Sequence, residues 1–448
     1  MDASSVYLQH HKVPELIDKL VLLLVSEQPA NAKQYLKEKL EELIEARFEG
    51  DAATLLDRTL PPLNPRATIR PVLVAKFAGT ADVYRKLGKL RTSLGVSLDD
   101  CLRGGIEYHT HGDAALTPAN PPYGLLMGDG ESYQAFSEVL DATLGARIGG
   151  AGLQGPGGKT FMAPKSELGS GPITSGFQFP EKYVVGAGVK LARNIATFRM
   201  SCCTTRAERR ELARIVQAAS LSAFQGSSST SGSIKAATLA ATDPLLMDLR
   251  IAPAIAPEDT EPWLRPANIE WPDARHSFVS HDNVFFVNVL CGTEHVEIAS
   301  KAVRSHDVRD AFERVAHGAR TLEEALRNED GKLEWQNSPK YGNLMSNLDH
   351  LYGGGMMVHF ILRLPLLAAH PNLTVVLNKL KLQQVPAHNY TKSCQHPPTE
   401  VVAVRNKTDE KPYSVMEADL VQLCCASVST LIELEEVLQT GGHIEGRY

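Results

Sequence analysis

The N-terminal segment alternates apolar and polar positions with the period of an α-helix. Apolar side chains recur three or four residues apart over residues 13–24, which predicts an amphipathic helix. The Gln-Pro-Ala sequence at 28–30 is expected to end this helix. Asn31 is suited to cap a second helix, whose apolar positions run through residues 35–44. The pattern therefore predicts a helical hairpin within residues 1–48.

The apolar stripe of the first helix predicts an interface. Two helices of this length cannot bury both stripes against one another, so we expect the hairpin to pair with a second copy or with a related hairpin in a four-helix bundle. The alternative is that the hairpin packs against its own chain as an intramolecular brace. The residues expected at the pairing surface are Val13, Leu16, Ile17, Leu20 and Leu24.

The hairpin also has the features of a docking domain. A leucine-rich helix, a proline break and the Tyr35-Leu36 pair resemble the dimerisation/docking domain of the regulatory subunits of cAMP-dependent kinase. The resemblance implies a shallow apolar groove that binds the amphipathic anchoring helix of a scaffold protein. Docking domains of this kind occur on diverse proteins of ciliary and flagellar axonemes, so the resemblance also implies an axonemal setting.

Breakers and periodic segments divide the rest of the chain. Residues 49–72 and 151–180 are rich in proline or glycine and are predicted to be linkers. Residues 73–150 are mainly helical and predict a small all-α domain. In residues 181–448, the clearest segments are a strand at 284–290 and helices at 308–326 and 417–438. We therefore expect an α+β fold, in which a large domain with an antiparallel β-sheet flanked by helices follows the hairpin and the small domain.

Composition narrows the classes of function. The 448 residues are 43% hydrophobic and 22% charged, as in ordinary globular proteins. A net charge of −6 and a pI near 6.2 offer no basic surface, so neither nucleic acid nor an anionic membrane is an expected partner. The seven cysteines have no CxxC spacing, and no leader or membrane-spanning run is evident. We therefore expect a reduced, cytoplasmic protein.

Two motifs that could bind a ligand are weak. The glycine-rich stretch 152–160 ends like a phosphate-binding loop, but Leu153 stands where that loop needs its first glycine. Alternating residues of a polar loop could coordinate a metal, although such spacing is common by chance. These residues are His109, His111 and Asp113. The sequence therefore predicts neither a metal site nor a cofactor site.

Several longer motifs occur in order along the chain and resemble those of the phosphagen kinases, such as creatine and arginine kinases. Tyr183–Asn194 is similar to YVVSSRVRCGRS, and Cys291–Glu297 is similar to NEEDHLR. Other matching segments are Leu94–Gly105, Gly128–Leu140, Trp271–Phe278, Gly342–Pro365, Leu380–Gln384 and Asp419–Leu423. The resemblance implies the phosphagen-kinase fold and a site for phosphoryl transfer between a nucleotide and a guanidino group.

The residues that carry this chemistry in the family are largely replaced. The phosphate-binding arginines fall on Gly188, Lys190, Glu297, Met356 or Met357, and Val385. The substrate-aligning glutamates fall on Thr293 and near Tyr390, and the reactive cysteine falls on Asn347. Arg193, Arg275 and His295 match the family, with structural hydrogen bonding as their expected role. The net charge at the five arginine positions is therefore zero, because the charges of Lys190 and Glu297 cancel.

The resemblance with these losses predicts a catalytically inactive homologue, a pseudoenzyme without catalytic, cofactor-binding or metal-binding residues. Such a chain would act as a structural or scaffold subunit of an axonemal complex such as a radial spoke, in contact with other axonemal proteins. One alternative is a nucleotide-binding sensor without turnover. Another is an active guanidino kinase with a reorganised site, for which Arg193, Arg275 and Arg363 are candidates.

Overall fold

The structure is a computed structural model that describes most of the large C-terminal part of the chain. The described residues are 20–21, 24, 29, 31–37, 39, 83, 86–102, 124–148, 179–224, 250–253, 276–280, 283–290, 293–302, 308–330, 333–385, 398–407 and 417–448. The chain forms two compact units, Met1–Pro65 and Arg66–Tyr448. The predicted small and large domains both lie in the second unit. Among the described helices, none is long and apolar enough to cross a membrane.

Within the first unit, the predicted cap of the second helix is confirmed. Residues 32–37 are helical, and the Oδ1 atom of Asn31 accepts a hydrogen bond from the Gln34 backbone N–H at 3.1 Å. Leu20 and Leu24 are helical and half-buried. The other residues expected at the pairing surface, Val13, Leu16 and Ile17, lie outside the described residues.

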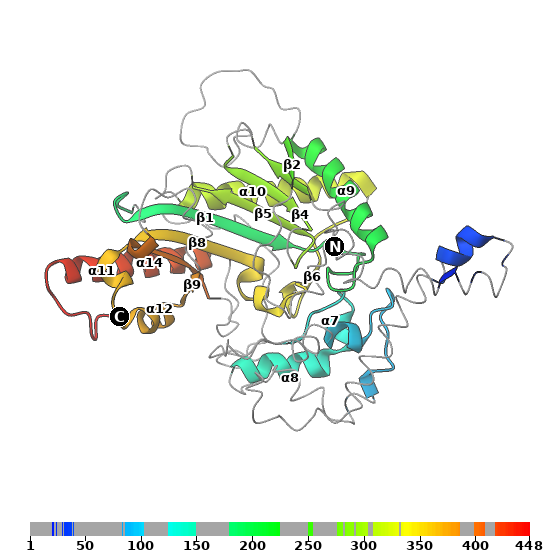
Figure 1. Cartoon of the computed structure of the whole chain (residues 1–448), viewed down its shortest axis with the longest axis horizontal. Coiled ribbons are helices and arrows are strands. Elements are labelled where there is room, and N and C mark those ends of the chain that lie inside the picture. The colour runs from blue at the N-terminus through cyan, green and yellow to red at the C-terminus, as the bar shows by residue number, and fades with distance from the viewer. Residues whose placement is uncertain are drawn as a thin grey trace, which may run out of the picture. The chain divides into compact units, whose positions relative to one another are not determined.

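The second unit is built on an eight-stranded antiparallel sheet (Figure 1), which confirms the predicted α+β fold. In spatial order its strands are β2 (Arg250–Pro253), β3 (His276–Val279), β4 (Phe285–Val289), β5 (Val296–Lys301), β1 (Val184–Arg193), β8 (Met356–Arg363), β10 (Val401–Asn406) and β9 (Leu382–Val385). A separate two-stranded sheet joins β6 (Asn337–Ser338) and β7 (Gly342–Asn343). Strand β1 lies between β5 and β8, so both of its edges are paired.

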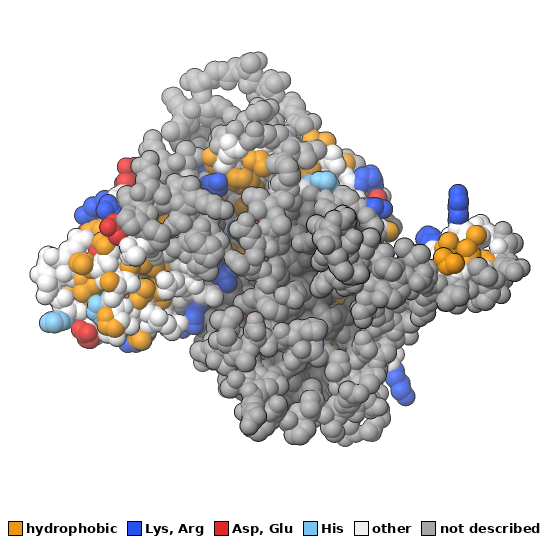
Figure 2. Space-filling view, viewed as in Figure 1, with side chains coloured by type: hydrophobic (Ala, Val, Ile, Leu, Met, Phe, Trp, Pro, Cys, Tyr) orange, Lys and Arg blue, Asp and Glu red, His pale blue; other side chains and the backbone are white. Residues whose placement is uncertain are grey.

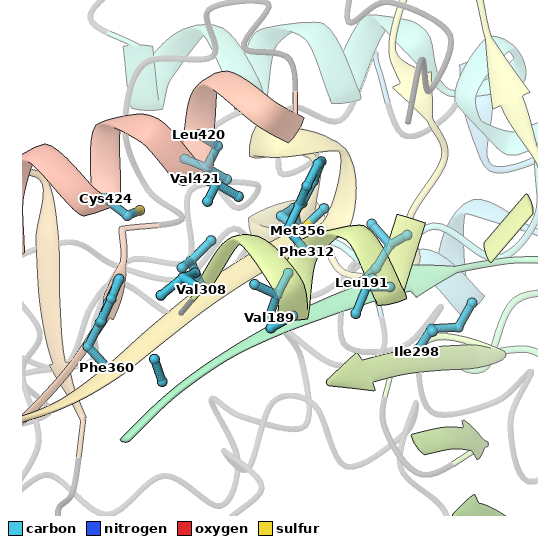
Figure 3. Close-up of a cluster of buried hydrophobic side chains, with 14 of the residues drawn as sticks. Val189, Leu191, Ile298, Val308, Phe312, Met356, Phe360, Leu420, Val421 and Cys424 are labelled. Carbon is cyan, nitrogen blue, oxygen red and sulfur yellow. The ribbon is translucent and has the colours of Figure 1, made fainter. Parts of the chain in front are cut away.

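One face of the sheet is apolar and packs against long helices. Alternate residues of β1, such as Val189 and Leu191, are buried with Phe312 of one helix and Leu420 of another (Figure 3). The long helices are α9 (Arg206–Phe224), α10 (Val308–Asp330), which carries Phe312, and α14 (Glu417–Gln439), which carries Leu420. The last two confirm the predicted helical periodicity, since apolar residues three and four apart face the sheet. Each buried leucine contributes roughly 1.5–3 kcal/mol.

Short helices complete the C-terminal part of the unit. They are α11 (Pro365–Ala368), α12 (Leu373–Lys379) and the 3₁₀ turns η4 (Leu348–His350), η5 (Tyr352–Gly355) and η6 (Pro398–Glu400). Leu366, Val375 and Leu423 are exposed on α11, α12 and α14, where Figure 2 shows hydrophobic side chains among polar atoms. Scattered apolar side chains of this kind are normal on a protein surface.

The helical part that precedes the sheet is hydrogen-bonded to the loop at residues 345–347, which includes Asn347, the residue matched to the reactive cysteine. This part contains α7 (Ser132–Ala135) and α8 (Ser137–Ile148). The Met127 backbone N–H donates to the Ser346 carbonyl at 2.9 Å, and Leu126 forms an isolated β-bridge with Asn347. The buried Tyr133 hydroxyl donates to the Met345 carbonyl at 2.6 Å and accepts from the Met345 N–H at 3.1 Å. The loop is therefore fixed from the side of the small domain.

We predict that Tyr133→Phe lowers the free energy of unfolding by about 1–3 kcal/mol, because it leaves two buried backbone groups of Met345 without their partner. Tyr183→Phe is the matched control, since its hydroxyl makes one long bond of 3.3 Å to Gln439, and it should cost less. Denaturant unfolding of the two variants measures the difference. Equal losses would contradict the role assigned to Tyr133.

Candidate active site

A row of side chains crosses five strands on the sheet face opposite the helices. The antiparallel register aligns Lys301 of β5, Gly188 of β1, His359 of β8, Arg405 of β10 and Gln383 of β9. Residues paired in this way project to the same face of a sheet. We call these five residues the cross-strand row. With strands about 4.8 Å apart, the Cα atoms of its two cations are roughly 14 Å apart.

The middle of the row lacks the expected arginine and is filled by a histidine. A Cβ atom on Gly188 would lie 2.5 Å from the Nε2 atom of His359, so the ring occupies the space above the glycine. Desolvation, with a further contribution from the charge of Lys190, lowers the pKa of His359 to about 4. The ring is therefore neutral at pH 7 and does not repel the cations beside it.

The predicted charge reversal at Glu297 is neutralised within the sheet. Glu297 forms a close ion pair with Lys190, and both side chains are half-buried. Asn288 donates to Glu297 at 3.2 Å and accepts from the Ser277 hydroxyl at 2.8 Å, which fixes the carboxylate in place. The charge of Glu297 is therefore neutralised by Lys190. Lys301 and Arg405 then give this face a positive charge.

Arg405 reaches the position where another arginine is expected. Met356 is buried in the core (Figure 3), whereas Met357 pairs with Lys190 and faces the row. Of the two residues that could match the phosphate-binding arginine, Met357 is therefore the one on the same face as the row. The Arg405 Nη1 atom lies 3.6 Å from the Met357 sulfur, and its Nε and Nη2 atoms donate to Gln383 at 3.3 and 3.2 Å. The guanidinium of Arg405 on β10 therefore lies beside Met357 of β8, where the family's arginine is expected.

Two of the three candidate arginines, Arg193 and Arg363, form ion pairs within the protein. Arg193 is fully buried, where it pairs with Glu417 at 3.2 Å and donates to the Gly354 carbonyl at 2.6 Å. Arg363 forms a partly exposed ion pair with Glu400 at 3.1 Å. Arg275 and the position near Tyr390 lie outside the described residues. Val385 ends β9 as a neutral side chain.

His295 is also structural, as expected. Its Nδ1 atom accepts from the Ile195 N–H at 3.1 Å, so Nε2 carries the proton and donates to the Arg199 carbonyl at 2.7 Å. Its backbone N–H donates to the side chain of Asn194 at 2.9 Å. Complete burial lowers the pKa of His295 to about 4, mainly through desolvation. The ring is therefore held neutral by backbone groups of the segment that follows β1.

A buried carboxylate next to the matched glutamate position was missed in the sequence. Glu294 is 4% exposed, and its two oxygen atoms accept hydrogen bonds from five groups. The donors are the side chains of Asn194, Thr293 and His350 and the backbone N–H groups of Ser346 and Asn347. We call these six residues the carboxylate cluster. Its signal in the sequence was the acidic residue between Thr293 and the matched His295.

Comparison with known proteins finds relatives over most of the chain. Residues 72–143 match the family model of the ATP:guanido phosphotransferase N-terminal domain. Lombricine kinase of Eisenia fetida is 27% identical over 369 residues, which cover 82% of this chain and 91% of that protein. Creatine kinase B-type of Gallus gallus is 25% identical over 371 residues, which cover 82% and 89%.

Solved structures agree on the fold. The crystal structure of lombricine kinase superposes with a TM-score of 0.64 at 22% identity, covering 84% of this chain and 94% of that one. A duplicated taurocyamine kinase from Schistosoma mansoni gives a TM-score of 0.62 at 20% identity, covering 84% and 48%. The fold is thus that of the phosphagen kinases. The chain is a homologue of the ATP:guanido phosphotransferases.

The prediction that the chain is not an enzyme is wrong. The relatives that match 82% of its length are named as kinases, lombricine kinase and creatine kinase among them. The charge comparison made from the sequence left out two cations on neighbouring strands. Lys301 and Arg405 stand on the same sheet face at positions that were not matched, and Lys190 neutralises Glu297.

The lowered pKa of His295 predicts a loss of stability in acid. The unfolded chain binds a proton near the ordinary pKa of 6.5, whereas the folded chain binds it near 4. The stabilisation is therefore complete above pH 6.5 and is lost as the pH falls toward 4, by about 3 kcal/mol. Unfolding free energies measured from pH 7 to 4 should fall less steeply in His295→Gln, and the exposed control His443→Gln should follow the parent. An unchanged slope in His295→Gln would contradict the assignment.

Proposed function

We propose that this chain is an active ATP:guanidino phosphotransferase with a reorganised phosphate-binding face. The observation that carries the proposal is the cross-strand row, in which Lys301 and Arg405 flank positions where the family has arginines. Phosphoryl transfer depends mainly on positioning and on stabilising negative charge. Cations supplied by neighbouring strands serve that purpose as well as cations at the matched positions.

Arg405 is the better placed of the two cations for a phosphate. Its planar guanidinium presents several donors, of which Nε and Nη2 are held by Gln383. Lys301 is exposed at the other end of the row, with its ammonium 5.0 Å from the centre of the Phe286 ring. A polyphosphate along the row would meet one cation near each end and the neutral His359 between them.

The second candidate is a nucleotide sensor that binds without turnover. The observation in its favour is Thr293, a neutral hydroxyl in place of a substrate-aligning glutamate. Both candidates require nucleotide to bind the positive face, and only the first requires phosphoryl transfer. The same purified chain can therefore decide between them.

We predict that the full chain transfers phosphate from magnesium-ATP to at least one of arginine, creatine, lombricine or taurocyamine. Arg405→Gln and Lys301→Gln should each lower kcat/KM by about 10–100-fold, since each removes a charged hydrogen-bonding partner worth about 1.5–3 kcal/mol. Arg327→Gln is the control, because Arg327 lies in exposed ion pairs on α10. A coupled assay for ADP release gives these rates.

Two outcomes would contradict the proposal. Saturable stabilisation by magnesium-ADP without transfer to any acceptor would favour the sensor. Transfer that is equally fast in Arg405→Gln, Lys301→Gln and the parent would show that the row does not bind the phosphates.

For the N-terminal unit, we propose pairing through the hairpin and docking of an amphipathic anchoring helix. The support is the half-buried apolar pair Leu20 and Leu24 on helical residues, together with the cap at Asn31. Other axonemal proteins and a place in a cilium or flagellum are part of the same proposal, and proximity labelling in ciliated cells would test them.

We predict that Leu20→Glu with Leu24→Glu abolishes self-association and leaves the second unit folded, because a buried charge without a partner opposes pairing. Lys37→Glu, at an exposed helical position, is the control and should associate like the parent. Light scattering reports association and circular dichroism reports folding. Unfolding of the whole chain by the double substitution would instead identify the hairpin as an intramolecular brace.

A further inference from the structure

The carboxylate cluster holds one histidine in a defined orientation. Glu294 accepts from Asn194 at 2.5 Å, from the N–H groups of Ser346 and Asn347 at 2.7 and 3.0 Å, and from the Thr293 hydroxyl at 3.1 Å. These four donors fix the position of the carboxylate. The Nδ1 atom of His350 lies 3.2 Å from the same carboxylate, so it donates to Glu294 and carries the ring proton.

This orientation leaves the other ring nitrogen of His350 available. Among the described residues, Nε2 of His350 makes no hydrogen bond, and the side chain is 18% exposed compared with 3% for Glu294. A neutral imidazole held by a carboxylate through Nδ1 is arranged to accept a proton at Nε2. Glu294 itself is buried and already accepts hydrogen bonds from five groups.

The cluster lies where the resemblance places the chemistry. Thr293 is matched to a substrate-aligning glutamate, and its hydroxyl is 3.5 Å from Nδ1 of His350. Asn347 is matched to the reactive cysteine, and its backbone N–H and side chain hold Glu294 and the start of η4. The two positions that lost their functional side chains therefore both contact the Glu294–His350 pair.

We infer that His350 is the catalytic base of the phosphotransfer reaction and that Glu294 is its positioning residue. The inference rests on the proposed function. It places a histidine, supported by the neighbouring carboxylate, beside the position of the absent substrate-aligning glutamate. Among the described residues, Glu294 is the charged group that contacts the ring, and Asp349 precedes it in the chain.

The step balances without a further reagent. A nitrogen of the acceptor guanidinium loses a proton to Nε2 of His350 and forms a bond to the γ-phosphorus of ATP. The bond from that phosphorus to the β–γ bridging oxygen breaks, and its electron pair leaves on ADP. His350 becomes an imidazolium that Glu294 stabilises, and it returns the proton to water when the products leave.

The test uses the full chain and separates turnover from binding. His350→Gln should lower kcat by about 10²-fold or more and leave the KM for ATP within about twofold, because the ring acts on the acceptor. The acid limb of the kcat profile should disappear in this variant. In His350→Gly, added imidazole should restore part of the lost rate. His443→Gln, at an exposed position, is the matched control and should behave like the parent.

Each result decides the question. A parent chain that transfers phosphate, with His350→Gln equally fast, would overturn the role of His350 and leave the proposed function standing. A slow His350→Gln with an unchanged pH profile, together with a slow His350→Gly that imidazole does not restore, would make the residue structural and overturn it as well. A parent chain that transfers no phosphate to any acceptor would overturn both proposals.

Discussion

The register of strand β1 between β5 and β8 is the constraint on which the rest of the structure depends. One slip by a single residue would exchange the two faces of the strand. In the observed register, Val189 and Leu191 lie in the core, and Gly188 and Lys190 lie on the opposite face. The same register places Lys301 and His359 on either side of Gly188. The apolar core and the charged face are therefore fixed by one set of backbone hydrogen bonds.

The register also explains how a sheet can change its cations and keep its fold. A side chain lost from one strand leaves room that a neighbour on an adjacent strand fills, as His359 does above Gly188 and Arg405 does beside Met357. Such exchanges keep the apolar side of the sheet unchanged, because each involves only residues of the opposite face. The core therefore places little restriction on which strand supplies a charge.

Periodicity was sufficient to predict the elements and insufficient to predict the site. The helix at Val308–Asp330 and the strand at Phe285–Val289 follow from apolar spacing alone, since burial of one face decides both. The sequence left the match open between Met356 and Met357, and only the structure shows that Met357 pairs with Lys190 on the charged face. Arg405 can place its charge beside Met357 only because β10 pairs with β8, although the two residues are 48 positions apart in the chain. No local pattern contains that information.

The carboxylate cluster and the Arg193–Glu417 pair illustrate two different uses of a buried charge. Arg193 is enclosed, so its ion pair ties β1 to α14 and is closed to any ligand. The guanidinium also donates to the backbone carbonyls of Ala192 and Gly354, and these hydrogen bonds offset part of the cost of burying the charge. Glu294 is equally enclosed, but one of its five donors is the ring of His350, a side chain that is partly exposed. A buried carboxylate thereby acts on the outside of the protein through a histidine, which an arginine without a second titratable atom cannot do.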